Sequence, residues 1–253
     1  MSKQPCRFGL IGYPLEHSAS ARYFANKFER ERLTGYSYTL FPLLSADEVR
    51  PLIAATPGLQ GLNVTIPYKQ SIIPLLDRLD PVAEKIGAVN TVKVRHSGTG
   101  FELTGYNTDA EGFRRSLNPG FQHTHALILG TGGSAKAVAY ILGEMGLEVL
   151  KVSRTKKAEG IITYKEISKA LLERFTLIVN CTPAGMFPDI DMAPHLPFDL
   201  LGSRHFIYDL IYKPIETKLL RLAGGTGARV QNGMKMFENQ AELSFRIWMA
   251  TEK

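Results

Sequence analysis

The segment Ala126-Leu127-Ile128-Leu129-Gly130-Thr131-Gly132-Gly133-Ser134-Ala135 decides the fold. Its four apolar residues are typical of a buried strand, and the residues from Ala135 onward have the pattern of a helix. Gly130, Gly132 and Ala135 match G-x-G-x-x-A, in which the first glycine permits a tight turn, the second lets the backbone approach a pyrophosphate, and the small third residue lets helix and strand pack. Free N–H groups and the helix dipole favour phosphate there. The segment predicts a Rossmann dinucleotide-binding turn, the alternative being a tight turn without a ligand.

The next strand indicates which dinucleotide binds. Strands of NAD sites usually end in Asp or Glu, which binds the ribose 2′-hydroxyl. Here the predicted strand Glu148–Val152 is followed by Ser153-Arg154-Thr155-Lys156-Lys157, with no acid at its tip. Arg154 has the geometry to pair with a 2′-phosphate and to stack on adenine, and Lys156 or Lys157 adds a second charge. NADP is therefore the predicted cofactor, although a solvated basic loop would have the same composition.

Composition excludes several classes of protein. The 253 residues suffice for one large domain or two small ones, and 44% hydrophobic with 21% charged residues argues against disorder, collagen and coiled coil. No apolar run approaches the roughly 18 residues needed to span a membrane, and Met1–Pro14 lacks the features of a secretory signal. Cys6 and Cys181 are therefore expected to be buried thiols rather than a disulfide, and the protein is expected in the cytoplasm.

The net charge of +6 indicates a mildly basic surface or attraction for a small anion. The basic residues are scattered, without a basic block or an aromatic-interleaved stripe, so a nucleic-acid partner is the weaker interpretation. We expect a small-molecule substrate, no nucleic-acid or membrane partner, and a monomer or homodimer.

Strand and helix patterns alternate along the chain. The predicted strands are Arg7–Ile11, Tyr36–Phe41, Leu59–Val64, Ala88–Val94, Phe101–Gly105, Ala126–Leu129, Glu148–Val152, Thr176–Val179, Phe206–Tyr208 and Ala228–Val230. The predicted helices are Ser18–Arg32 with Ser18 as N-cap, one opened by a capping box at Ser45–Glu48, Asp109–Leu117, Ala135–Gly143 and Met234–Trp248. This order predicts an α/β fold of two α/β domains with mostly parallel sheets and a cleft between them.

Polar clusters stand where strands of the first half end: His17–Ser20, Asn63–Lys69, Gly87–Thr91 and Gly105–Asp109. Ligands of open α/β sheets bind beyond the carboxyl ends of strands, so these clusters are expected to converge. One amine, one carboxylate and several neutral groups suit a polyhydroxylated anionic small molecule. Taken singly, Ser18 or Asp109 would serve equally as a helix cap, and Asn90 as a turn residue.

Together these motifs resemble the NADP-dependent shikimate dehydrogenases of aromatic amino-acid biosynthesis. The residues that carry the resemblance lie in family order over nearly the whole chain: His17–Ser20, Asn63–Lys69, Gly87–Thr91, Gly105–Asp109, Gly130–Gly133, Ser153–Thr155, Asn180–Met186, Tyr208–Tyr212 and Gln240. The family often has Asn at the position of Ser153, where Ser can still donate one hydrogen bond. It often has Gly at the position of Lys235, where a lysine would either alter the nicotinamide pocket or point to solvent.

The resemblance implies a role for each matching residue. The shikimate carboxylate would rest on Ser18 and Ser20, with Tyr212 nearby. The ring hydroxyls would meet Thr65, Lys69, Asn90, Asp109 and Gln240. The expected cofactor contacts are Gly130, Thr131, Gly132, Gly133, Ser134, Ala135, Ser153, Arg154, Thr155, Lys157, Asn180, Thr182, Leu210 and Gly233.

The resemblance also implies the domain limits. A discontinuous substrate domain would comprise residues 1–107 plus 235–253, and the NADP-binding Rossmann domain residues 108–234. The implied reaction is reversible hydride transfer between NADPH and the C3 carbonyl of 3-dehydroshikimate. Lys69 would stabilise the growing negative charge on oxygen and deliver the proton. Asp109 would hold a substrate hydroxyl and favour the charged form of Lys69, and the two would titrate as a pair.

No metal is expected, because His123 and His125 lack partners at ligand spacing. Three alternatives stay open. They are a quinate/shikimate dehydrogenase with relaxed substrate or cofactor use, a methylenetetrahydrofolate dehydrogenase, and an inactive NADP-binding paralogue or regulator. The Ser18/Ser20 pair disfavours a pterin substrate, and the intact Lys69 and Asp109 disfavour an inactive protein.

Overall fold

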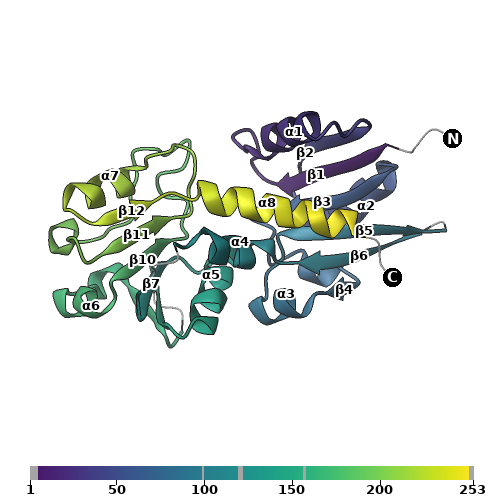
Figure 1. The fold of residues 1–253 in the computed structure, drawn as a ribbon. Coiled ribbons are helices and arrows are strands. Elements are labelled where there is room, and N and C mark those ends of the chain that lie inside the picture. Colours follow the sequence, from purple (N-terminus) through teal and green to yellow (C-terminus); the bar gives the residue numbers. More distant parts are fainter. Residues whose placement is uncertain (1–4, 99, 119–121, 156–157, 251–253) are drawn as a thin grey trace. The chain divides into compact units, whose positions relative to one another are not determined.

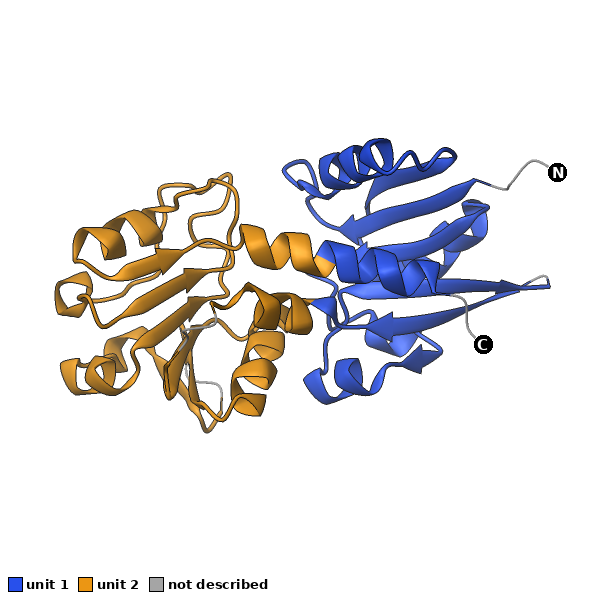
Figure 2. Ribbon diagram, in the orientation of Figure 1, with its two compact units in different colours: residues 1–108, 241–253 blue, residues 109–240 orange. Residues whose placement is uncertain are grey.

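The computed structural model describes residues 5–98, 100–118, 122–155 and 158–250 of the chain. The chain forms two compact units, shown in Figures 1 and 2. Unit 1 comprises Met1–Thr108 with Ala241–Lys253, and unit 2 comprises Asp109–Gln240. Each unit contains one sheet with helices on it, as the strand–helix alternation predicted. The functional domain limits at 107/108 and 234/235, and the cleft expected between the domains, stay predictions.

Unit 1 has a mixed sheet of six described strands in the order β2-β1-β3-β5-β6-β4. Their bounds are β1 (Cys6–Gly12), β2 (Tyr36–Pro42), β3 (Leu59–Val64), β4 (Arg78–Leu79), β5 (Thr91–Ser97) and β6 (Gly100–Tyr106). Strand β1 runs parallel to β2 and β3, whereas β5 is antiparallel to β3 and β6. The helices are α1 (Ser20–Arg30), α2 (Val49–Ala55), α3 (Pro81–Ile86) and the second half of α8 (Met234–Met249).

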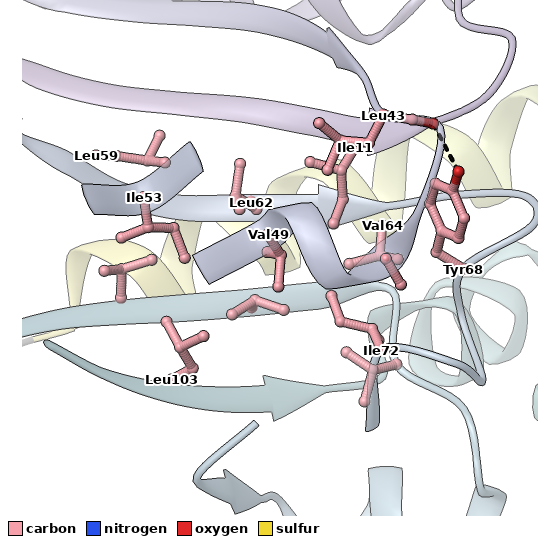
Figure 3. Close-up of a cluster of buried hydrophobic side chains, with 14 of the residues drawn as sticks. Ile11, Leu43, Val49, Ile53, Leu59, Leu62, Val64, Tyr68, Ile72 and Leu103 are labelled. Carbon is pink, nitrogen blue, oxygen red and sulfur yellow. Dashed lines mark hydrogen bonds between the residues drawn. The ribbon is translucent and has the colours of Figure 1, made fainter. Parts of the chain in front are cut away.

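Two hydrophobic clusters hold this sheet. One contains Val49 and Ile53 of α2 with strand residues such as Leu62 and Leu103, and Figure 3 shows these side chains pointing toward one another. Tyr68 lies at the end of the cluster, and its hydroxyl donates to the Leu43 carbonyl oxygen at 2.6 Å. Burial of these apolar side chains is the main stabilising contribution to the unit.

The second cluster is aromatic and joins α1 to α8. Phe8 of β1 stacks on Trp248 with ring centroids 4.8 Å apart, and Phe24 and Phe28 of α1 pack against the same group. At its border the Lys27 ammonium, only 4% exposed, is 2.8 Å from the Glu242 carboxylate. This ion pair lowers the pKa of Glu242 below its usual value, although burial opposes the effect. The last turns of α8 are therefore an integral part of unit 1.

Unit 2 has a sheet whose described strand pairs are all parallel, in the order β12-β11-β10-β7-β8-β9. The bounds are β7 (His125–Leu129), β8 (Glu148–Ser153), β9 (Ile161–Thr163), β10 (Leu177–Asn180), β11 (Phe206–Asp209) and β12 (Arg229–Gln231). Numbered from β7, this is the 3-2-1-4-5-6 order of the Rossmann fold. The helices are α4 (Thr108–Ser116), α5 (Gly133–Glu144), α6 (Lys169–Arg174), α7 (Lys218–Gly225) and the first half of α8.

The predicted fold class is confirmed, and most predicted strands agree with the structure to within one or two residues. The strand predicted from Ala88 begins only at Thr91, because Ala88–Asn90 form the connection from α3. The short strands β4 and β9 were not predicted. Both cysteines lie in described residues, and neither forms a disulfide, but they are half-buried rather than buried.

Two helix starts test the capping predictions. The capping box at Ser45 and Glu48 is present, and it opens a 3₁₀ turn (Ala46–Glu48) that leads into α2. The prediction of Ser18 as N-cap is wrong, since α1 begins at Ser20 and its N-cap is Ala19. The Ser18 hydroxyl instead accepts a hydrogen bond from the Ser20 backbone N–H at 3.2 Å. The sequence pattern alone does not distinguish such a local turn from an N-cap. Within the described ranges, no helix is long and apolar enough to cross a membrane.

Candidate active site

In unit 1 the predicted polar clusters lie at one edge of the sheet, here called the carboxyl edge of unit 1 because β1 and β3 end there. Backbone hydrogen bonds join the segments directly: Thr65 N–H donates to the Ile11 carbonyl at 2.9 Å, and Tyr13 N–H to the Ile66 carbonyl at 3.0 Å. The antiparallel strand β5 starts at this edge, and Val64 N–H donates to the Asn90 carbonyl at 2.8 Å. The topology thus gathers the turns that carry Ser18, Ser20, Thr65, Lys69 and Asn90.

Lys69 lies in the turn after β3. Its backbone carbonyl accepts the N–H of Val89 at 2.7 Å, so the turn is tied to the connection that carries Asn90. The side chain is half-buried, as are those of Ser18 and Thr65, whereas Ser20 and Asn90 are buried. An amine held on a braced turn at a strand end is positioned for chemistry on a small molecule.

A buried neutral network lies behind this edge. We call Asn63, Asn90, Thr91, Thr108 and Ser244 the hydroxyl–amide cluster. The Thr91 hydroxyl lies 2.7 Å from that of Ser244 and 3.0 Å from that of Thr108, and Asn63 Nδ2 donates to Ser244 Oγ at 2.9 Å. Asn90 Oδ1 accepts the Thr108 backbone N–H at 2.6 Å. Asn90 therefore fixes the first turn of α4, the helix on which Asp109 is the second residue.

Sequence reasoning placed Asn63, Thr91 and Thr108 inside motifs but assigned them no role, and it missed Ser244. Ser244 is fully buried on α8, 181 residues from Asn63. A serine in an amphipathic helix carries no local signal of such a contact. Only the docking of α8 onto the sheet brings it there.

In unit 2 the strand ends align in one row, the carboxyl edge of unit 2. Asn180 pairs in register with both Leu129 and Asp209, and Leu129 with Val152. The loops after β7, β8, β10 and β11 therefore leave the sheet together. They carry the glycine turn, Arg154, Thr182 and Leu210, which are all predicted cofactor contacts.

The glycine turn has the geometry that its pattern predicts. Gly130 has φ +110°, a conformation that favours glycine, and its N–H donates to the Val152 carbonyl at 2.8 Å. Helix α5 starts at Gly133 with Gly132 as its N-cap. A glycine has no side chain, so the N-cap residue makes no side-chain capping hydrogen bond to this end of the helix. A Cβ added at Gly132 would meet no described atom within 4 Å. The N-terminus of α5 thus has space at Gly132 for an anionic group such as a pyrophosphate.

The loop after β8 presents a permanent cation. Ser153 is half-buried, whereas Arg154 and Thr155 are exposed. Arg154 lies near Tyr164, where its charge acts to lower the pKa of the tyrosine, although burial has the larger effect and raises it. Lys157 lies outside the described residues. The side chains present therefore fit a 2′-phosphate, with Arg154 to pair with it and no carboxylate in Ser153–Thr155 to repel it.

The buried carboxylate of Asp209 holds the loops after β10 and β11 in place through hydrogen bonds. We call Asn180, Thr182, Asp209 and Thr217 the carboxylate cluster. Asp209 accepts hydrogen bonds from Asn180 Nδ2 at 2.9 Å, Thr217 Oγ1 at 2.6 Å and the Ile211 N–H at 3.1 Å. Asn180 Oδ1 in turn accepts from the hydroxyl of Thr182 at 2.7 Å. Burial raises the pKa of Asp209 to about 6, against the opposing effect of the three donors. Asp209 and Thr217 were not predicted as functional residues, although Asp209 lies at the end of β11 inside the Tyr208–Tyr212 motif.

Leu210, Tyr212 and Gly233 are brought together beyond β11. Gly233 N–H donates to the Ile211 carbonyl at 3.1 Å, and a Cβ at Gly233 would lie 2.0 Å from the Leu210 carbonyl oxygen, so only glycine fits. Tyr212 is half-buried and stacks on Phe237 of α8, with ring centroids 4.5 Å apart. Lys235, the second departure from the family pattern, is exposed.

Asp109 and Gln240, the remaining predicted residues, both belong to unit 2. Asp109 is buried on α4, and Gln240 is half-buried on α8, where its Nε2 donates to the Phe237 carbonyl at 3.0 Å. The two helices touch at Gly112 of α4, where Asn239 Nδ2 also donates to the Gly112 carbonyl at 3.2 Å.

The histidines near β7 have local partners. A ring nitrogen of His123 lies 2.8 Å from the Thr176 hydroxyl, and His125 is 3.2 Å from the Glu148 carboxylate. In the described ranges, no group of three or more His, Cys, Asp or Glu residues is arranged to hold a metal ion.

Comparison with known proteins identifies the family. Residues 10–92 match the model of the shikimate dehydrogenase substrate binding domain. The NADP(+)-dependent shikimate dehydrogenase of Desulforamulus reducens is 34% identical, over 95% of this chain and 88% of the relative. The chain belongs to the shikimate dehydrogenase family.

Solved structures of the family agree with the fold. The shikimate dehydrogenase of Thermus thermophilus, solved with NADP(H) and shikimate, has a TM-score of 0.81 and 33% identity, with 96% of this chain and 93% of that chain covered. A quinate dehydrogenase of Corynebacterium glutamicum, solved with NAD, has the same TM-score at 28% identity and covers 98% and 95%. Solved structures that resemble this chain therefore include one named shikimate dehydrogenase and one named quinate dehydrogenase.

Proposed function

We propose that this chain is an NADP-dependent shikimate dehydrogenase, which reversibly reduces 3-dehydroshikimate to shikimate in aromatic amino-acid biosynthesis. The observation that carries the proposal is the edge of unit 2. The N-terminus of α5, with its glycine N-cap, follows Gly130, and the loop after β8 offers Arg154 with no acid in Ser153–Thr155. These groups fit a dinucleotide with a 2′-phosphate.

The substrate contacts are proposed from both units. Ser18 and Ser20 would bind the carboxylate, supported by their common position at the end of β1 and the start of α1. Thr65, Lys69 and Asn90 would bind ring hydroxyls, since their turns meet at the carboxyl edge of unit 1. From unit 2, Asp109 and Gln240 would add further contacts to the ring and Tyr212 to the carboxylate.

The cofactor contacts are proposed around the carboxyl edge of unit 2. The glycine turn would hold the pyrophosphate, and Ser153, Arg154 and Thr155 the 2′-phosphate end. Leu210 and Gly233 would flank the nicotinamide, and Asn180 and Thr182 would line the cofactor loop, supported by the hydrogen bonds that fix these segments. Bound NADPH supplies the hydride.

Proton transfer is assigned to Lys69. As the substrate carbonyl becomes an alcohol, negative charge grows on its oxygen, and an ammonium within hydrogen-bond reach both stabilises that charge and delivers the proton. Asp109 would hold the neighbouring substrate hydroxyl and orient the ring. Both roles rest on matching residues in this sequence and on the braced positions of their elements.

The test is a spectrophotometric assay of shikimate and of quinate, each with NADP⁺ and with NAD⁺. We expect reduction of NADP⁺ by shikimate to have the highest kcat/KM. Comparable rates with quinate or NAD⁺ would favour the relaxed enzyme, for which the likeness to a quinate dehydrogenase is the motivating observation. Binding of NADP⁺ without turnover of either acid would favour the inactive paralogue.

The carboxylate assignment has its own test. Each Ser→Ala change at positions 18 and 20 should lower kcat/KM for shikimate by about 10–150-fold, the value of a hydrogen bond to a charged group. An analogue without the carboxylate should react poorly with the wild type and lose little more in the double variant. Normal kinetics with a lower Tm would mean that the serines are only structural. Cytoplasmic location and the oligomeric state stay predictions.

A further inference from the structure

Helices α4 and α8 approach each other unusually closely in unit 2, and the contact is made by Gly112. A Cβ added at Gly112 would lie 2.9 Å from Gln240 Cβ, 3.0 Å from Gln240 N and 3.1 Å from the Met236 carbonyl oxygen. These atoms are backbone or attached directly to it, so they move only if α8 moves. Ordinary Cβ contacts begin at 3.4 Å.

Backbone conformation does not require glycine at this position. Gly112 is not among the glycines with positive φ, and glycine is a poor helix former. Gly143 of α5 is a useful contrast, because it too lacks a positive φ, yet a Cβ there would meet no described atom within 4 Å outside its chain neighbours and the backbone of its own helix. The close approach of α8 is therefore the physical reason for a glycine at position 112.

The contact lies next to two proposed substrate residues. Gln240 makes the contact from α8. Asp109 lies three residues before Gly112, on the same face of α4. Asn239 holds the pair together by donating to the Gly112 carbonyl at 3.2 Å. The distance between the two helices at Gly112 thus sets the separation of Asp109 from Gln240.

We propose that Gly112 is a positioning residue that holds Gln240 at the correct distance from Asp109 for the shikimate ring. The inference rests on the proposed function. A methyl group at position 112 would push the helices apart by about 0.5 Å. Catalytic and binding residues must be placed to within about this distance for a site to function. The glycine turn and Arg154 lie on other elements, so the affinity for NADP⁺ is expected to change much less than the kinetics with shikimate.

The experiment compares Gly112→Ala with Gly143→Ala as the matched helix glycine. Gly112→Ala should lower kcat/KM for shikimate at least about tenfold while KM for NADP⁺ changes less than about twofold. Gly143→Ala should keep wild-type kinetics, since its methyl group meets no described atom. In a Gln240→Ala background, Gly112→Ala should cost little more, because its effect acts through Gln240. Full additivity, or wild-type kinetics in a folded Gly112→Ala protein, would overturn the proposal.

Two further measurements keep the outcome clear. If Gly112→Ala does not fold, Asn239→Ala loosens the same contact without adding volume, and it should lower kcat/KM for shikimate with KM for NADP⁺ unchanged. Amide hydrogen exchange over residues 236–240 should be faster in Gly112→Ala than in the wild type. This readout needs no substrate, so it tests the helix contact even if wild-type protein fails to oxidise shikimate. Unchanged exchange would refute the role of Gly112, and an inactive wild type would refute the proposed function.

Discussion

The carboxyl edges of the two sheets differ in their charge. In unit 1 the hydroxyl–amide cluster behind the edge consists of neutral amides and hydroxyls, and the edge carries the amine of Lys69. In unit 2 the carboxylate cluster behind the edge contains the buried carboxylate of Asp209, and the edge carries a helix N-terminus and the guanidinium of Arg154. One edge therefore has an amine that can exchange a proton, and the other has a permanent cation with fixed backbone donors.

This difference separates the two tasks of the proposed reaction. A lysine gains and loses a proton, as a general acid must, whereas arginine stays charged at any ordinary pH and suits phosphate binding. Changes at the edge of unit 1 should therefore act on the chemical step, and changes at the edge of unit 2 on cofactor affinity.

Lys69→Ala is the strongest test of that division. Turnover should fall by ~10²–10⁴-fold, the usual contribution of a general acid, while shikimate binding stays largely intact. Steady-state kinetics of shikimate oxidation with saturating NADP⁺ measure both quantities. A variant with near wild-type kcat would remove Lys69 from the mechanism and with it the chemical role of unit 1.

Arg154→Ala should act in the opposite way. Loss of a charge-assisted contact to the 2′-phosphate should raise KM for NADP⁺ by about 10–150-fold, and KM for NAD⁺ much less, because NAD⁺ lacks that phosphate. The two cofactors are titrated at fixed shikimate concentration. Equal effects on both would mean that Arg154 does not recognise the 2′-phosphate.

Asp209 should make the stability of unit 2 depend on pH. Burial raises its pKa to about 6 in the folded protein, from 3.8, so the folded state binds this proton more tightly than the unfolded state. The stabilisation of the folded state that this tighter proton binding provides is present in full below about pH 4. It is lost as the pH rises through about 6, and the free energy of unfolding then falls by about 2–3 kcal/mol. Urea unfolding of wild type and Asp209→Asn should show it. The stability difference between them should shift in favour of the Asn variant from pH 4 to pH 7, and a constant difference would contradict the raised pKa.

Thr91→Val is the matched change in unit 1. It removes one hydroxyl of a neutral cluster and leaves Ser244 its hydrogen bonds with Asn63 and Thr108. The free energy of unfolding should fall by about 1 kcal/mol. The loss should be the same at pH 4 and pH 7, because no cluster side chain ionises there. A pH-dependent loss would show that the cluster is coupled to a charged group.

The elements that agree with the sequence-based predictions are those with a strong local pattern. Strand β3 matches its predicted bounds, and the glycine turn has the positive φ at Gly130 that its motif requires. The start of α1 is different, because local rules favour serine over alanine as an N-cap and therefore favoured Ser18. The backbone path after β1 instead places the first turn at Ser20 and the N-cap at Ala19. The short strands β4 and β9 escaped prediction because two or three residues carry no periodicity.

By itself, the sequence determined the alternation of strands and helices in unit 2, the glycine turn and the absence of an acid after β8, since each depends on neighbouring residues and on the period of apolar side chains. Only the tertiary structure decided which polar groups are buried together. Ser244 meets Asn63 from 181 residues away, and Gly112 is explained by a helix that lies more than 120 residues later. The pKa of Asp209 likewise follows from burial among groups on β10, in the loop after β11 and at the N-cap of α7. Burial, close approach and the shared charge of a site are properties of packing, and packing depends on segments far apart in the chain.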